Sequence, residues 1–154
     1  MTTIAYKDGQ IAVDSCVSEH SYKIPGSAVK FTQKGQWILF VTGDAGRQDD
    51  IFTHFTSLHM AQQDYYEIPC LFPTDTKLIV FDTKTKLVTE IYRRNKDDEY
   101  VSAYTYAEDS VVAFGSGLKF AMGAMMAGAT PTEAVKIASE LDVRTGGEIH
   151  TFPL

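Results

Sequence analysis

A threonine directly follows the initiator methionine, and its position alone could give it chemistry. If Met1 is removed, Thr2 carries both a hydroxyl and a free α-amine. The hydroxyl can attack a carbonyl carbon, and an α-amine, with an ordinary pKa of about 7.7–8.0, can accept the hydroxyl proton. An N-terminal threonine is therefore a candidate nucleophile that supplies its own base. The alternative is that Thr2 is simply the second residue of an ordinary chain.

Five short motifs are spread in order over nearly the whole chain. They are the Thr2-Thr3-Ile4 opening with its strand Ile11–Asp14, the stretch Ala28–Phe31, the run Trp37–Gly46, Phe114-Gly115-Ser116-Gly117 and Asp142–Gly147. In this order they resemble the peptidase subunits of the proteasome family, namely proteasome β-subunits and the HslV peptidase. These are N-terminal nucleophile hydrolases. The short chain also resembles proteasome-like proteins of phage genomes.

The resemblance assigns a role to each polar residue of these motifs. Thr2 matches the nucleophile, Lys30 the lysine that favours its alkoxide, and Asp14 the carboxylate that pairs with this lysine. The residues that match those holding the threonine and its amine are Ser116, Asp142 and Thr145.

Each of these residues also has a simpler interpretation. Lys30 could be a surface lysine on an alternating strand, and Asp14 could form a local Asx turn with Ser15 or Cys16. Ser116 could begin a helix, and Asp142 could end one.

The resemblance also implies an oxyanion donor and a substrate pocket. The main-chain N–H of Gly43 matches the donor that stabilises developing negative charge. Residues that match the substrate-binding positions are Val17, Ser18, Ala28, Val41 and Ala45. Four of them, Val17, Ala28, Val41 and Ala45, match the lining of the first specificity pocket and are all apolar, so we expect a preference for an apolar residue at the cleaved position.

Composition bounds the remaining function classes. The chain has 154 residues, 44% hydrophobic and 22% charged, which is typical of one globular domain. The net charge of −6 argues against a nucleic-acid surface, and no apolar run approaches the roughly 18 residues of a membrane span. The first residues show neither the basic region nor the apolar run of a signal segment, so we expect none, and the two cysteines have no CxxC spacing. We therefore expect a cytoplasmic protein, or a virion protein if phage-encoded, with neither a cofactor nor a metal.

Hydrophobic periodicity predicts the elements, and the residue pairs Asp8-Gly9 and Lys34-Gly35 predict hairpin turns between strands. The predicted strands are Thr2–Tyr6, Gln10–Cys16, Ala28–Thr32, Trp37–Thr42, Lys77–Asp82, Leu87–Tyr92, Tyr100–Tyr104, Val111–Phe114 and Glu148–Phe152. The predicted helices run from Gly46 to about Glu67, from Ser116 to about Ala127 and from Thr130 to Leu141. This order favours an α+β fold. The resemblance sharpens it to a single domain over residues 1–154, a four-layer αββα sandwich in which one family helix is missing.

Two functions from different classes remain open. The first is a threonine-type endopeptidase subunit that forms a homo-oligomer and cleaves peptides or unfolded proteins, with an ATPase as candidate partner. The second is a non-catalytic assembly component that retains Met1 and has a virion protein as candidate partner. The complete set of matched polar residues favours the first. Asp44 beside the oxyanion position, Cys16 where relatives have arginine, and the missing helix are departures from the family pattern.

Overall fold

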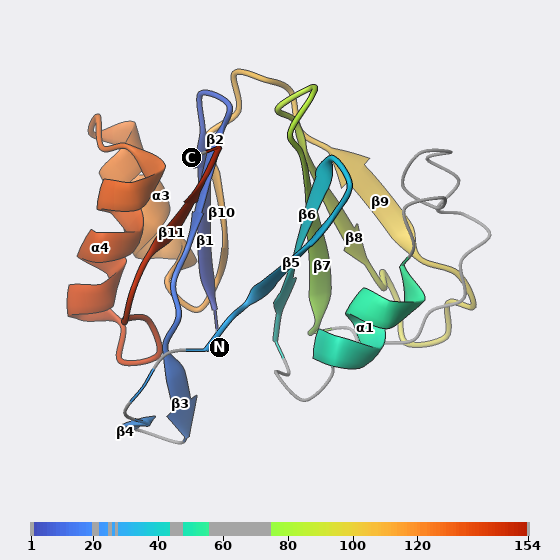
Figure 1. Ribbon diagram of the computed structural model, residues 1–154, viewed down its shortest axis with the longest axis horizontal. Helices are drawn as coiled ribbons and strands as arrows, with labels where there is room; N and C mark the ends of the chain where they lie inside the picture. Colours follow the sequence, from blue (N-terminus) through green and yellow to red (C-terminus); the bar gives the residue numbers. More distant parts are fainter. Residues whose placement is uncertain are drawn as a thin grey trace. The chain divides into compact units, whose positions relative to one another are not determined.

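The protein is described from a computed structural model, which covers residues 2–19, 22–24, 26, 28–43, 48–55 and 75–153. Contacts divide the chain into two compact units (Figure 1). The first unit comprises Met1–Lys30 and Ala107–Leu154, and the second comprises Phe31–Tyr106. Among the described residues, each unit has its own main sheet and its own apolar cluster, with two helices in the first unit and one in the second.

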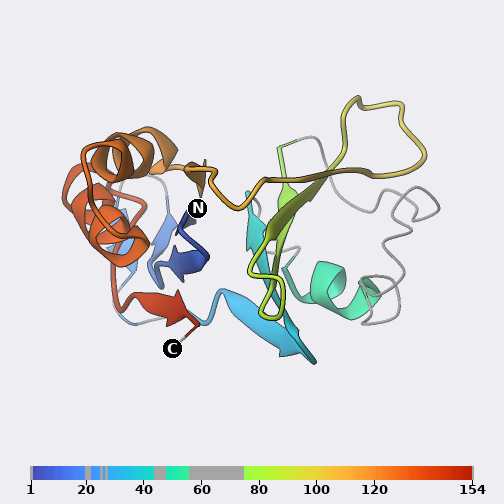
Figure 2. The ribbon, with the colours of Figure 1, turned by 90° about the horizontal axis from the view of Figure 1, so that it is seen from above.

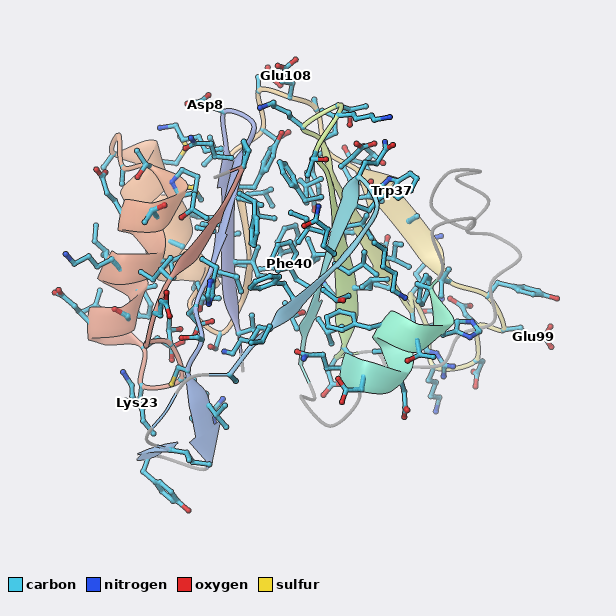
Figure 3. All side chains as sticks on the ribbon, in the orientation of Figure 1. Asp8, Lys23, Trp37, Phe40, Glu99 and Glu108 are labelled. Atoms are coloured by element: carbon cyan, nitrogen blue, oxygen red, sulfur yellow. The ribbon has the colours of Figure 1, made fainter. Side chains whose placement is uncertain are left out.

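The main sheet of the first unit has four antiparallel strands in the order β10-β1-β2-β11. They are β1 (Thr3–Lys7), β2 (Gln10–Val13), β10 (Val112–Gly115) and β11 (His150–Phe152). Asp8 and Gly9 join β1 to β2, and both have positive φ, at 52° and 73°. This is the pattern of a two-residue hairpin turn whose twist matches that of the strands, and it confirms the predicted turn. Asp8 marks the tip of the hairpin in Figure 3.

Two helices cover one face of this sheet, α3 (Leu118–Met126) and α4 (Pro131–Leu141), as Figures 1 and 2 show. Their contact with the sheet consists largely of alanines, which allow helix and strand backbones to approach closely. The buried cluster is Ala5, Ala12, Ala113, Ala121, Met125, Ala134, Val135 and Ala138. The predicted start of α4 is confirmed, because Thr130 and Glu133 form a capping box with Pro131 in the first turn.

The second unit is built on five antiparallel strands in the order β5-β6-β7-β8-β9. They are β5 (Phe31–Lys34), β6 (Trp37–Thr42), β7 (Lys77–Asp82), β8 (Val88–Tyr92) and β9 (Ser102–Thr105). The short helix α1 (Gln48–His54) packs on one face through a buried cluster of Leu39, Val41, Ile51, Phe52, Phe55, Leu78, Val80, Ile91 and Val101.

The predicted strands β6 and β7 have the bounds that the structure shows, and most other boundaries agree within two residues. The β2 strand ends at Val13, three residues before the predicted Cys16, because the N–H of Thr3 bonds to the Asp14 side chain and not to its main-chain carbonyl. The β5 strand begins at Phe31, so the prediction that Lys30 lies on an alternating strand was wrong. The turn after it is Gly35-Gln36, one residue later than predicted, because Lys34 stays in the ladder opposite Trp37.

A small hairpin of β3 (Val17–Glu19) and β4 (Tyr22–Ile24) was not predicted. Its strands have only three residues each, which is too short for a period-two pattern to stand out. The predicted helix from Gly46 to Glu67 is observed as α1, and its part beyond Phe55 lies outside the described residues, as does the segment 68–74. The prediction of a missing family helix falls on that part of the chain. None of the helices in the described ranges is long and apolar enough to cross a membrane.

Candidate active site

Asp14 is a fully buried carboxylate at the end of β2. Its Oδ1 accepts a hydrogen bond from Thr3 N at 3.0 Å, and its Oδ2 accepts from Cys16 N at 3.3 Å and Gly146 N at 3.1 Å. A buried carboxylate needs partners of this kind because burial removes its hydration. The bond from Cys16 is the local Asx turn that was the alternative interpretation of Asp14. Asp14 therefore forms this local turn and also accepts the bonds from Thr3 and Gly146.

Lys30 supplies the countercharge of Asp14. Its Nζ lies 3.0 Å from Oδ1 and 3.1 Å from Oδ2, and the side chain is only 7% exposed. The predicted contact between the two residues is therefore confirmed, and the interpretation of Lys30 as a surface lysine was wrong. An ammonium buried to this degree is stable only when it is paired, and removing either partner leaves a charge uncompensated.

A second polar cluster forms around Asp142, the residue that ends α4. Oδ2 of Asp142 accepts from Ser116 Oγ and from Thr145 Oγ1, both at 2.6 Å, and Oδ1 accepts from Arg144 N at 3.2 Å. Burial by itself raises the pKa of Asp142. The hydrogen bonds from Ser116, Thr145 and Arg144, together with the charge of Arg144, outweigh burial and lower that pKa. The carboxyl is therefore ionised at neutral pH.

The simple capping interpretations hold only in part. Asp142 does end α4, but its side chain is also bound to a residue from outside that helix. Ser116 is not the N-cap of α3, since that position belongs to Gly117.

Each residue of the Gly115-Ser116-Gly117 motif contacts Thr2 or Thr3 at the start of β1. A Cβ at Gly115, where φ is +94°, would lie 1.4 Å from the carbonyl oxygen of Thr2, so only glycine fits there. The Ser116 N–H donates to that same oxygen at 3.1 Å. A Cβ at Gly117 would lie 2.4 Å from Thr3 Oγ1. The motif thus fixes the main chain of Thr2, which is itself only 6% exposed.

The Thr145-Gly146-Gly147 motif is fitted to the end of β2 in the same way. Gly146 donates to Asp14, as described, and its carbonyl accepts from Ser15 N at 3.1 Å. Gly147 has a φ of +73°, and a Cβ there would lie 2.5 Å from Ser15 Oγ. Gly147 is therefore required for the two turns to approach each other, whereas Gly146 contributes main-chain hydrogen bonds.

Six predicted site residues lie in the first unit: Thr2, Asp14, Lys30, Ser116, Asp142 and Thr145. The structure brings them into two clusters, Asp14 with Lys30 and Asp142 with Ser116 and Thr145, and the main chain of Thr2 is bound beside the second.

Thr3 is the residue that sequence reasoning missed. It is fully buried, its N–H bonds to Asp14, and its hydroxyl lies 2.6 Å from that of Thr145. The available signal was a second threonine at the head of an otherwise apolar strand.

The predicted oxyanion and pocket residues are divided between the units. Gly43 and Val41 belong to the second unit, and Ala45 lies outside the described residues. Gly43 has a φ of +100°, and a Cβ there would lie 2.7 Å from the Asp75 carbonyl oxygen, so local packing also requires this glycine. Val41 is 4% exposed and packs in the cluster under α1.

In the first unit, Val17 and Ser18 lie on β3, with Val17 36% exposed, and Ala28 is half-buried.

No protein-family model matches the sequence, and no curated protein matches it. Solved structures do match. The BPH protein of Thiobacillus denitrificans in complex with epoxomicin is 19% identical, with a TM-score of 0.66 over 98% of this chain and 96% of that one. Another structure of the same BPH is 20% identical, with a TM-score of 0.66 over 98% and 95% of the two chains. A eukaryotic HslV from Trypanosoma brucei is 16% identical, with a TM-score of 0.69 over 98% and 97%.

These likenesses extend over nearly the whole of each chain, so the fold comparison does not rest on one unit alone. They confirm the predicted α+β fold class. The protein therefore has the N-terminal nucleophile hydrolase fold of the HslV type.

Proposed function

We propose that this chain is a threonine-type endopeptidase subunit of a homo-oligomeric proteasome-like assembly, with Thr2 as its nucleophile once Met1 is removed. The observation that carries the proposal is the buried Asp14–Lys30 pair, whose carboxylate is bound to the N–H of the residue that follows Thr2. A buried, desolvated ion pair contributes little net stability, so its presence next to a candidate nucleophile favours a chemical role.

The proposed reaction has two halves. In the first, the Thr2 α-amine takes the proton of the Thr2 hydroxyl, and the oxygen attacks the substrate carbonyl carbon. The peptide C–N bond breaks, the leaving amine receives the proton, and an ester joins Thr2 to the acyl group. In the second half, water loses a proton to the α-amine and attacks the ester, which releases a carboxylic acid and restores Thr2.

The surrounding residues have separate roles in this scheme. The Lys30 ammonium stabilises negative charge on the threonine oxygen, and Asp14 holds that ammonium in place. Ser116, Asp142 and Thr145 hold the α-amine through hydrogen bonds. The main-chain N–H of Gly43 donates to the oxyanion.

The proposed substrates are peptides or unfolded proteins. The proposed pocket is lined by Val17, Ala28, Val41 and Ala45, with Ser18 as a further substrate-binding residue. Four of these side chains are apolar, so an apolar residue at the cleaved position would gain about 25 cal/mol per Å² buried, whereas a charged one would be desolvated unpaired. We propose a location in the cytoplasm, or in a virion if the protein is phage-encoded, with an ATPase or a virion protein as partner.

Epoxomicin tests the nucleophile, because a peptide epoxyketone needs both a hydroxyl and a free amine on one residue. Intact mass should show a chain lacking Met1, and epoxomicin should add once, at Thr2. Thr2→Ala should abolish both the adduct and peptide hydrolysis, while Thr132→Ala, a threonine on α4 outside the site, should keep both. An adduct that persists in Thr2→Ala, or that maps to Cys16, would overturn the assignment.

The same preparations distinguish the other function and test the pocket. A wild-type chain that retains Met1 and forms no adduct would support the non-catalytic assembly component instead. In an active preparation, fluorogenic peptides should be cleaved faster after Leu, Phe or Tyr than after Arg or Lys. The reverse order would contradict the proposed pocket.

A further inference from the structure

Thr3 connects the two polar clusters of the first unit. It is fully buried, and its main chain forms two bonds to Asp14: Thr3 N donates to Oδ1 at 3.0 Å, and Asp14 N donates to the Thr3 carbonyl at 3.3 Å. Its hydroxyl contacts Thr145 Oγ1 at 2.6 Å and accepts from Gly117 N at 3.0 Å. One residue therefore touches the Asp14–Lys30 pair with its backbone and the Asp142 cluster with its side chain.

The available protons set the direction of this hydroxyl chain. An ionised carboxylate only accepts hydrogen bonds, so the single hydroxyl proton of Thr145 points to Asp142 Oδ2. The Thr145 oxygen must then accept from Thr3, whose own proton is used in that bond. The Thr3 oxygen in turn accepts from the Gly117 N–H. The order of donation is Gly117 to Thr3 to Thr145 to Asp142, with no freedom for any hydroxyl to turn.

Because these hydroxyls are buried, they cannot exchange their hydrogen-bond partners for water. Thr3 and Thr145 are both 0% exposed, so bulk water cannot replace a lost partner. The site is also shaped around Thr3, since a Cβ at Gly117 would lie 2.4 Å from its Oγ1 and 3.0 Å from its Cγ2. A buried donor or acceptor that loses its partner is penalised by its full desolvation.

We propose that Thr3 is a positioning residue of the active site: its hydroxyl holds the Thr145 hydroxyl on Asp142, and its main chain holds the start of β1 on Asp14. Through these two sets of bonds it fixes the preceding residue, Thr2, relative to both clusters. Its proposed effect on catalysis rests on the proposed function, whereas its control of the Thr145 side chain does not.

Paired substitutions separate the hydroxyl from the methyl group. Thr3→Val keeps the shape and removes the hydroxyl, so the Gly117 N–H loses its acceptor and Thr145 its donor. We expect kcat for a fluorogenic peptide to fall about tenfold, the size of the lost bond to the Thr145 hydroxyl, with KM within about twofold. Thr3→Ser keeps the hydroxyl and should restore kcat to within about threefold of wild type. If Thr3→Val does not fold, Thr3→Ser against Thr3→Ala gives the same comparison.

The matched control is a second threonine pair in the same unit. Thr132 on α4 and Thr151 on β11 have hydroxyls 2.5 Å apart, and neither is part of the site. Thr132→Val should therefore leave kcat unchanged. A loss of kcat as large in Thr132→Val, or in Thr3→Ser, as in Thr3→Val would mean that Thr3 acts only through stability, and the proposal would be wrong.

A structural readout distinguishes failure of this inference from failure of the proposed function. Three-bond couplings to the threonine methyl carbons report the χ1 rotamer of Thr145 in the full-length protein. We expect one rotamer in wild type and Thr3→Ser, and averaging in Thr3→Val, whether or not the protein hydrolyses peptides. A single fixed Thr145 rotamer in Thr3→Val, with kcat unchanged where activity is present, would overturn the inference. Absence of an epoxomicin adduct in wild type would instead overturn the proposed function.

Discussion

Each unit of the molecule holds a lysine–carboxylate pair in its sheet region, and the two pairs are built differently. In the first unit, the side chains of Lys30 and Asp14 are 7% and 0% exposed. In the second, Lys77 on β7 lies 2.6 Å from Glu90 on β8, with side chains 40% and 9% exposed. Glu90 also accepts from Tyr106 Oη at 2.6 Å.

The two pairs also differ in the groups that donate hydrogen bonds to their carboxylates. Asp14 is bound by main-chain N–H groups of Thr3, Cys16 and Gly146, which come from segments far apart in sequence. The bonds described for Glu90 come from side chains of neighbouring strands and the residue just after β9. The first arrangement requires the chain to close around an ion pair, at a desolvation cost that the pair hardly recovers. The second is a cross-strand contact whose lysine is partly exposed to solvent. The difference supports the role in hydrolysis proposed for the first pair, whereas the second pair serves local stability.

Removing the two lysines gives the largest expected effect and tests this contrast directly. Under the proposed mechanism, Lys30→Met should lower peptide hydrolysis by at least about a hundredfold, because negative charge on the Thr2 oxygen would lose its counter-ion. It should also lower the free energy of unfolding by about 3–5 kcal/mol, since Asp14 stays buried without its cation. Far-UV circular dichroism should still show the folded protein. Lys77→Met should cost about 1 kcal/mol and leave hydrolysis within about twofold.

A double variant separates the effect of Lys30 on stability from its effect on hydrolysis. Asp14→Asn with Lys30→Met removes both charges, so it should recover part of the lost stability without recovering hydrolysis. Equal losses of hydrolysis in Lys30→Met and Lys77→Met would show that the two pairs do not differ in function.

Asp142 gives an intermediate effect that depends on pH. Its folded-state pKa is lowered, so its contribution to stability is present above the ordinary aspartate pKa of about 3.9 and is lost as pH falls through the lower folded value. Asp142→Asn should therefore flatten the loss of stability below about pH 4, measured by urea unfolding at several pH values, and should slow hydrolysis about tenfold. Asp109→Asn, at an exposed position of the same unit, is the control. An acid dependence identical to wild type in Asp142→Asn would contradict the assignment of the low pKa.

Local chemistry made much of the fold predictable from sequence. The Asp8-Gly9 turn and the start of α4 at Thr130 carry their own signals, because each depends on residues within a few positions of one another. The β3–β4 hairpin was missed because three-residue strands show no period. Lys30 was placed on a strand because its neighbours alternate, but its ammonium is drawn to Asp14 before the strand begins.

The site was less predictable than the fold. The pairing of Asp14 with Lys30 came from a resemblance to a family, since 16 residues separate them and no local period links them. The contact between Thr3 and Thr145 spans 142 residues and joins two hydroxyls that are individually unremarkable in sequence. Contacts of this kind depend on how the elements pack, so only a structure could reveal that Thr3 lies between the two clusters.

Tyr106 gives the smallest expected effect. It tests the Lys77–Glu90 pair through the hydrogen bond that Tyr106 donates to Glu90. Burial raises the pKa of Tyr106, and the hydrogen bond to Glu90, the charge of Glu90 and the neighbouring Tyr104 and Tyr92 raise it further. Because the folded-state pKa is raised, this contribution to stability is present below the ordinary tyrosine pKa of about 10 and is lost as pH rises through the raised value.

In an alkaline absorbance titration to about pH 11, wild type and Tyr106→Phe should therefore show equal tyrosinate amplitudes. Glu90→Gln should show a larger amplitude, because Tyr106 loses its charged acceptor. Tyr106→Phe should cost about 1 kcal/mol of stability and leave hydrolysis unchanged, whereas a smaller tyrosinate amplitude in Tyr106→Phe would mean that the phenol is not held by Glu90.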